Sequence, residues 1–202
     1  MRNIAVCLLT AVIVAAGLSV PAFGATQTHT ASVPLQRTNW SRTVSIPQFD
    51  PSLGTLLSVG ITLAGHAEGT SFFENLGPNA ATVISKLCAE ITLTNSTPIT
   101  AAIPVLERTD NVGPFDGTID FGGASGMTIG GLMADDSSSA TMVSPADLAP
   151  FVGTNTVSLS AAAVGKSSVT GPGNLASGSQ TLASAVITVV YDYEPFASVG
   201  DR

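Results

Sequence analysis

The chain is poor in cysteine and in charged side chains. Of its 202 residues, 10% are charged and two are cysteines. Cys7 lies in an apolar N-terminal run, so a chain cut after that run keeps only Cys88 and cannot form an internal disulfide. Core burial must then hold the domain together. We expect Cys88 to be buried, and the alternative is a bond to another chain.

Basic side chains are scarcer still. The chain has seven Lys and Arg residues and 14 Asp and Glu residues, which gives a formal net charge of −7. Binding to nucleic acid or to anionic lipid needs clustered cations, so neither partner is expected. The two histidines, His29 and His66, are too isolated in the sequence to predict a metal site.

A secretory signal is predicted at the N-terminus. Arg2 precedes an uncharged apolar run over residues 4–20, Pro21 ends the run, and the small residues Ala22 and Gly24 have the spacing of a cleavage site. The run is shorter than the ~20 residues that span a bilayer. We therefore expect cleavage after Gly24 and a secreted protein, with the periplasm as the alternative location. No later apolar run has spanning length, so no membrane span is expected after cleavage.

The rest of the chain alternates with period two, and no helical period persists. The clearest apolar alternations cover residues 57–63 and 82–94, with Gly65–Gly69 read as a turn between strands. Residues 181–193 are apolar on both faces near their middle, which predicts a central strand. The pattern predicts an all-β fold, an antiparallel β-sandwich of jelly-roll or immunoglobulin-like type with about eight to ten strands after the signal helix.

One domain is expected, because no internal repeat or linker interrupts the pattern. The predicted organisation is a signal peptide at 1–24, a flexible N-terminal segment at 25–36, the sandwich domain at 37–195 and a short tail at 196–202.

Some shorter segments are also assigned. A short strand is expected at Thr118–Phe121, an exposed loop at Asp135–Ser139, and an edge or bulge at Pro104. One helical turn is expected with Ser144 as its N-cap and Pro145 as its first residue.

Two segments resemble a cofactor-binding motif and a catalytic motif, but the residues around them do not support either. The segment 171–176 matches the dinucleotide pattern G-x-G-x-x-A, but it lies in a Ser/Gly loop between strands and not before a helix. Ser125 has Gly123 two residues before it but Met127 two residues after it, so it does not form a nucleophile elbow. The sequence therefore predicts no catalytic residues and a protein that is not an enzyme.

Weak metal candidates are Asp116, Asp120, Asp135 and Asp136, which are expected in loops. Loop carboxylates bind Ca²⁺, but this spacing fits no known calcium loop. The more ordinary interpretation is solvated acids in turns, so no cofactor is expected.

Weak glycan-binding candidates are Trp40, Tyr191 and Tyr193, because sugars stack on exposed aromatic rings. The alternative for all three is packing in the core or at its edge.

Three segments carry a family resemblance. Residues 48–56 read Gln-Phe-Asp-Pro-Ser-Leu-Gly-Thr-Leu, residues 147–157 contain Asp-Leu-Ala-Pro-Phe-Val-Gly-Thr-Asn-Thr-Val, and residues 186–195 contain Val-Val-Tyr-Asp-Tyr-Glu-Pro. In this order they resemble the bacterial choice-of-anchor E domain. The resemblance implies an exported bacterial protein of unknown molecular function. C-terminal sorting signals follow that domain in the family, but residues 196–202 carry no such signal, so anchoring by that route is not expected.

The first of these segments has a structural interpretation. Asp50 can form an Asx-turn before Pro51, Gly54 can adopt positive φ, and Phe49 and Leu53 would pin the turn to the core. We interpret it as a corner between strands.

The leading functional hypothesis is a non-catalytic extracellular or surface-associated structural or interaction module. Its partner would be a second copy of itself or a polymer of the cell surface or matrix. A secreted glycan-binding module is the alternative, and a secreted hydrolase that uses loop carboxylates is less favoured.

Overall fold

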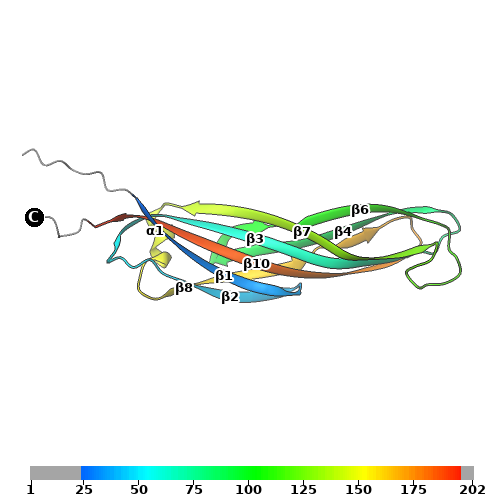
Figure 1. The fold of residues 1–202 in the computed structure, drawn as a ribbon, viewed down its shortest axis with the longest axis horizontal. Helices are drawn as coiled ribbons and strands as arrows, with labels where there is room; N and C mark the ends of the chain where they lie inside the picture. The colour runs from blue at the N-terminus through cyan, green and yellow to red at the C-terminus, as the bar shows by residue number, and fades with distance from the viewer. Residues whose placement is uncertain (1–23, 197–202) are drawn as a thin grey trace, which may run out of the picture.

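Two antiparallel sheets pack face to face in the computed structural model, which describes residues 24–196 (Figure 1). The first sheet has the order β1 (Ala25–Arg37), β10 (Leu175–Pro195), β3 (Gly54–Asn75), β7 (Gly126–Met142). The second has the order β2 (Trp40–Pro47), β8 (Thr156–Gly165), β4 (Ala81–Asn95), β5 (Thr97–Ala102), and β6 (Val105–Val112) and β9 (Ser168–Thr170) also pair with β4. The predicted β-sandwich and its number of strands are confirmed.

Long strands give the molecule its elongated form (Figure 1). Strand β3 has 22 residues and β10 has 21, and the two pair in antiparallel register from one end of the sandwich to the other. Strand β10 lies between β1 and β3. Its position confirms the prediction of a central strand from apolar side chains on both faces.

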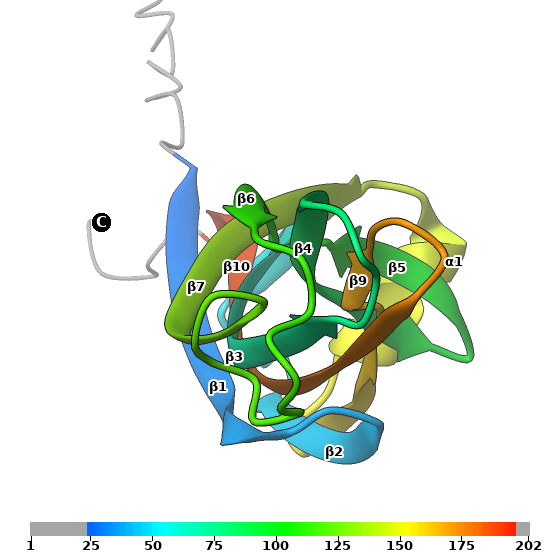
Figure 2. The same cartoon turned by 90° about the vertical axis from the view of Figure 1, so that its right-hand side faces the viewer.

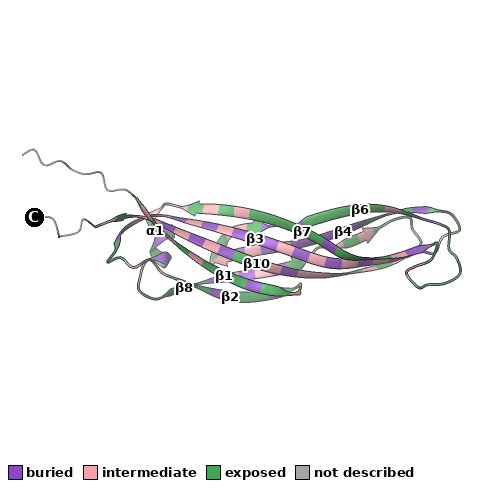
Figure 3. Cartoon of the chain, in the orientation of Figure 1, coloured by how far each residue is buried: buried purple, intermediate pink, exposed green. Residues whose placement is uncertain are grey.

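The core forms because alternate side chains of each strand point between the sheets. In β3, Val59, Ile61 and Leu63 are buried, and the residues between them are half-buried. The facing β4 contributes Leu87 and Ile91 in the same alternating way, so buried (purple) and intermediate (pink) residues alternate along the central strands in Figure 3. Burial of alternate side chains is the physical source of the period-two pattern.

The turn predicted at Gly65–Gly69 is wrong, because both glycines lie inside the continuous strand β3. Both lie on the face of β3 that is turned toward the second sheet. A Cβ on Gly65 would approach Ile91 Cδ1 to 2.7 Å, and a Cβ on Gly69 would approach Leu87 Cδ1 to 2.6 Å. These glycines therefore make room for large side chains of β4.

The segment 25–36 was expected to be flexible, and this expectation is wrong as well. It forms most of β1, which pairs with β10 from Ala25 opposite Tyr193 to Arg37 opposite Leu182. The segment is polar on one face, and its other face is half-buried at residues 25–31 and buried at Val33. Pairing with a central apolar strand holds it, and a local hydrophobic pattern does not reveal such pairing.

Two other local expectations fail. Asp135–Ser139 lies within β7 and not in a loop, and Thr118–Phe121 belongs to the connection between β6 and β7 and not to a strand. Figure 2 looks along the molecule toward this connection.

The helical turn is confirmed at the opposite end of the sandwich. Helix α1 (Pro145–Leu148) continues into the 3-10 helix η1 (Ala149–Phe151). The Ser144 hydroxyl accepts a hydrogen bond from the Asp147 backbone N–H.

Within residues 24–196 no helix is long and apolar enough to cross a membrane. The predicted signal peptide falls almost wholly outside the described residues, as does most of the predicted tail.

Candidate functional site

The three segments that carry the family resemblance meet at one end of the sandwich. The Phe49 N–H donates to the Phe151 carbonyl at 2.8 Å, and the Gly153 N–H donates to the Phe49 carbonyl at 2.9 Å. The Phe49 ring also packs against Tyr191 and Tyr193, with centroids 6.1 and 4.9 Å away. The Tyr191 hydroxyl donates to the Pro47 carbonyl at 2.7 Å, which joins the two sheets.

This arrangement confirms most of the corner predicted at residues 49–54. The Ser52 N–H donates to Asp50 Oδ1 at 2.9 Å, which forms the Asx-turn, and Phe49 is fully buried. Leu53 is 41% exposed, so it does not pin the turn to the core as predicted. Glycine is required at Gly54 because a Cβ there would collide with the backbone carbonyl of Glu194.

The aromatic candidates for sugar binding lie in the core or at its margin. Trp40 is buried and donates its Nε1–H to the Ala183 carbonyl at 3.2 Å, and Tyr191 is fully buried. Tyr193 is half-buried against Phe49. The core-packing alternative therefore holds for Trp40 and Tyr191, and neither ring offers a free face on which a sugar could stack.

The acidic candidates do not converge on one site. Asp116 and Asp120 lie in the connection between β6 and β7, where their side chains accept backbone N–H groups of nearby residues. Acceptance of the Thr118 N–H is the largest cause that lowers the pKa of Asp116. Asp135 and Asp136 lie further along β7. Among residues 24–196, no group of three or more His, Cys, Asp or Glu residues is arranged to hold a metal ion. That these weak candidates hold no metal stays a prediction.

A buried carboxylate organises the connection between β6 and β7. Glu74 is fully buried at the end of β3 and accepts hydrogen bonds from the Ser125 hydroxyl and from the Phe121 N–H at 2.8 Å. Asn75 next to it donates to the Gly113 carbonyl at 2.7 Å. A buried polar group needs such partners, so we interpret this cluster as a structural anchor for the connection.

A second charged cluster lies on the outward face of the first sheet. His66 Nδ1 is 2.7 Å from Asp135 Oδ1, and His66 Nε2 is 3.1 Å from Glu68 Oε1. Ionised carboxylates only accept hydrogen bonds, so both contacts are made only when the imidazole carries two protons. The pKa of His66 is accordingly raised above 6.5, mainly by the hydrogen bond to Glu68 and then by the one to Asp135.

A shallow hollow of about 500 Å³ adjoins this cluster. The small side chain of Ala64 and the neighbouring Val186 line it together with His66, Ser137 and Ser184. Both ring nitrogens of His66 already contact carboxylates. The imidazole therefore has no free nitrogen with which to deprotonate either serine, and its role here is to tie β3 to β7.

A row of short hydroxyl side chains crosses the outward face of the first sheet. Register places Thr30, Thr188, Thr62 and Ser139 side by side across the four strands. The Thr62 and Ser139 hydroxyls lie 2.8 Å apart. We call this surface the hydroxyl face, defined by these four residues together with Ser32, Ser137 and Ser184. The seven side chains that define it are short and uncharged, and the His66 cluster adjoins it beside Ser137 and Ser184.

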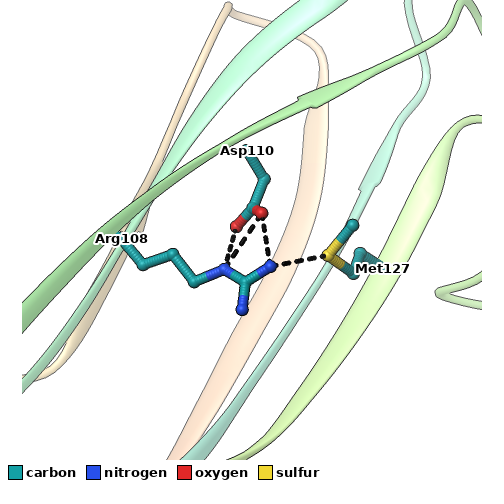
Figure 4. A network of polar contacts seen from close by, with 3 residues as sticks. All are labelled: Arg108, Asp110 and Met127. Carbon is teal, nitrogen blue, oxygen red and sulfur yellow. Dashed lines mark hydrogen bonds and ion pairs between the residues drawn. The ribbon is translucent and has the colours of Figure 1, made fainter.

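Charge on the second sheet is partly neutralised within one strand. Arg108 and Asp110 are two residues apart on β6, so their side chains share a face. The Arg108 guanidinium donates to Asp110 through Nε and Nη2, at 2.7 Å for the shortest contact, and Nη2 lies 4.0 Å from Met127 Sδ (Figure 4). This pairing raises the pKa of Arg108.

Cys88 is buried, as predicted. Cys88 is the last residue of β4 that pairs with β6, and the residues of β4 that follow it pair with β8 and β5. Its backbone N–H donates to the Ser167 hydroxyl at 2.9 Å, and its carbonyl accepts the Lys166 N–H at 2.8 Å.

Sequence reasoning missed the His66 and Glu74 clusters. His66 and Glu68 alternate on one strand, so the sequence could have shown that they share a face. Asp135 and Ser125 lie 69 and 51 residues from their partners, and only the packing of β7 brings them close.

The fold therefore defines a two-sheet antiparallel β-sandwich. No protein-family model matches the chain, and no curated protein matches it. Among solved structures, the chain is similar to part of dimeric latent PorU from Porphyromonas gingivalis, with a TM-score of 0.38 and 13% identity over 88% of this chain and 14% of that chain. It is also similar to the structure of infectious bursal disease virus Gx strain, with a TM-score of 0.20 and 13% identity over 86% of this chain and 38% of that chain. The chain thus spans a minor part of each, and neither likeness adds to the argument about function.

Proposed function

We propose that this protein is an exported, non-catalytic β-sandwich module that acts at the cell surface or in the extracellular matrix through its faces and edges. The predicted signal peptide and the resemblance to the choice-of-anchor E domain support export from a bacterial cell. The single observation that carries the proposal is the hydroxyl face. Its row of Thr30, Thr188, Thr62 and Ser139 crosses all four strands of the first sheet and is exposed or half-buried throughout.

Such a face suits a broad, uncharged partner. Short hydroxyl side chains neither protrude nor carry charge, so a polymer or a second protein can approach the sheet closely and exchange hydrogen bonds with it. The side chains of His66 and Glu74 are both hydrogen-bonded to other side chains of this chain. These bonds favour a structural role for those groups over a catalytic one.

The test combines location with binding. The protein is expressed in a bacterial host with its own leader, and the processed form is then mixed with insoluble surface and matrix material of bacteria. We expect export into the periplasm or medium and co-sedimentation with this material. Thr62→Arg on the hydroxyl face should weaken co-sedimentation about tenfold or more, which corresponds to ~1.4 kcal/mol.

Ser158→Arg is the matched control, because Ser158 is exposed on β8 of the second sheet. It should leave co-sedimentation unchanged. Retention of the chain in the cytoplasm would contradict the proposal. So would a hydrolytic activity that is lost when Asp116 or Asp120 is substituted, because such activity would favour the hydrolase alternative.

A further inference from the structure

Among residues 24–196, strand β1 leaves one long backbone edge without a partner strand. It is the outermost strand of the first sheet, and β10 is the only strand paired with it among the described residues. Figure 2 shows β1 at the outer side of the molecule. The backbone N–H and C=O groups on its other side are therefore open to a further strand.

The open part of this edge is Ala25–Val33. Pairing with β10 runs without interruption through these residues, and a register shift follows between Val33 and Gln36. Beyond the shift, Pro34 lacks an N–H, and the Arg42 side chain from β2 donates to Gln36 Oε1 at 2.9 Å. The C-terminal part of β1 is thus tied to β2, and the N-terminal part is not.

This edge lacks the devices that normally prevent strand addition. Proteins protect edge strands with charged side chains, prolines, bulges or a short strand. Residues 25–33 contain no Lys, Arg, Asp, Glu or Pro.

The remaining outer strands of the described region are protected or short, and β9 has only three residues. On β7, the Asp136 carboxylate accepts the Ile103 N–H at 2.7 Å, and Ser138 bonds the Thr100 hydroxyl, so β5 and its neighbouring connection cover that edge. Strand β2 carries Arg42, and β5 carries Pro98 within six residues. Strand β6 carries three charged residues, Glu107, Arg108 and Asp110.

We propose that β1 binds the β1 of a second copy of this chain, so that two molecules form a continuous sheet about a two-fold axis. Since β1 offers the one open, uncharged edge among the described strands, the partner edge in a second copy is β1 itself, which makes the contact isologous. This inference rests on the proposed function, because it names the partner of the same surface-acting module.

The side chains of Ala25–Val33 are complementary to themselves in an antiparallel pair. With the axis at His29, Thr28 lies opposite Thr30 and Thr26 lies opposite Ser32 of the second copy. Every pair on the outward face then joins two hydroxyl residues, a combination that stabilises neighbouring strands. On the inward face, Ala25 lies opposite Val33, Gln27 lies opposite Ala31, and His29 lies opposite His29 of the second copy, so no Lys, Arg, Asp or Glu side chains face one another.

A charge-swap experiment tests this pairing on the processed, exported protein. Analytical ultracentrifugation should show wild-type dimers. A double variant with Thr28→Lys and Thr30→Lys should raise the dimer dissociation constant about tenfold or more, because like charges then face each other across the axis. A second double variant with Thr28→Asp and Thr30→Asp should behave in the same way. An equimolar mixture of the two variants should recover a heterodimer.

Thr141→Lys is the matched control, since Thr141 is exposed at the other edge of the same sheet. It should leave the dimer intact, and circular dichroism should show that all variants are folded. A monomeric wild type, a dimer that both double variants retain, or a mixture that stays monomeric would overturn the inference. A monomer that is exported and still co-sediments with surface material would refute the dimer and leave the proposed function standing.

Discussion

Two buried serines have opposite surroundings, and they lead to opposite predictions. The Ser85 hydroxyl is buried without a hydrogen-bond partner, whereas the Ser125 hydroxyl donates to the buried Glu74 carboxylate. An unpaired buried hydroxyl destabilises a fold, and removal of the partner of a buried acceptor costs ~1–3 kcal/mol. We expect Ser85→Ala to raise the free energy of unfolding in urea and Ser125→Ala to lower it. Equal effects of the same sign would contradict this assignment of the two hydroxyls.

His66 gives a pH dependence at the same scale. Its folded-state pKa is raised above 6.5, so its stabilising contribution is complete below pH 6.5 and is lost as the pH rises through the folded-state pKa. Because Asp135 is 79% exposed, the contribution should be below ~1 kcal/mol. An NMR titration should give a pKa above 6.5 that falls in Glu68→Gln. An unshifted His66 would contradict the cluster.

At the scale of the element, strand β3 depends on small residues at inward positions. Gly65 faces Ile91 and Ala102 of the second sheet, whereas Ala64 beside it points outward and is exposed. Gly65→Val should therefore lower the free energy of unfolding by ~1–3 kcal/mol through overpacking. Ala64→Val, the matched control, should change it by less than ~0.5 kcal/mol. Chemical denaturation measures both, and equal costs would show that the two sheets do not approach as closely as the structure places them.

At the scale of the whole molecule, Tyr191 links the two sheets at the end where the three family-like segments meet. Tyr191→Phe removes the hydrogen bond to Pro47 and should cost ~1 kcal/mol of stability. Burial raises the pKa of Tyr191 to about 12, so stability from this group is complete below pH 10.0 and is lost as the pH rises through about 12.

An absorbance titration of tyrosinate measures this ionisation. The late step should be present in the wild type and in Tyr193→Phe, and it should be missing in Tyr191→Phe. A late step that persists in Tyr191→Phe would assign it to another group.

Local chemistry was sufficient for the features that depend on neighbouring residues. Alternation over residues 82–94 predicts β4 because every second side chain is buried, and Ser144 with Pro145 predicts the helical turn because a cap and its first residue are adjacent in sequence. The Asx-turn at Asp50 is equally local.

Only the tertiary structure decided the features that join distant segments. In the sequence, Gly65 predicts a turn, and only the packing of β4 shows that this glycine makes room for a large side chain. The pairing of β1 depends on a strand more than a hundred residues away. The same holds for the burial of Trp40, which bonds a residue 143 positions away. The sequence by itself determined the all-β character, because burial of every second side chain requires apolar and polar residues to alternate along each strand. The packing of the two sheets decided which groups are enclosed and which edge stays open, because these depend on contacts that no local pattern records.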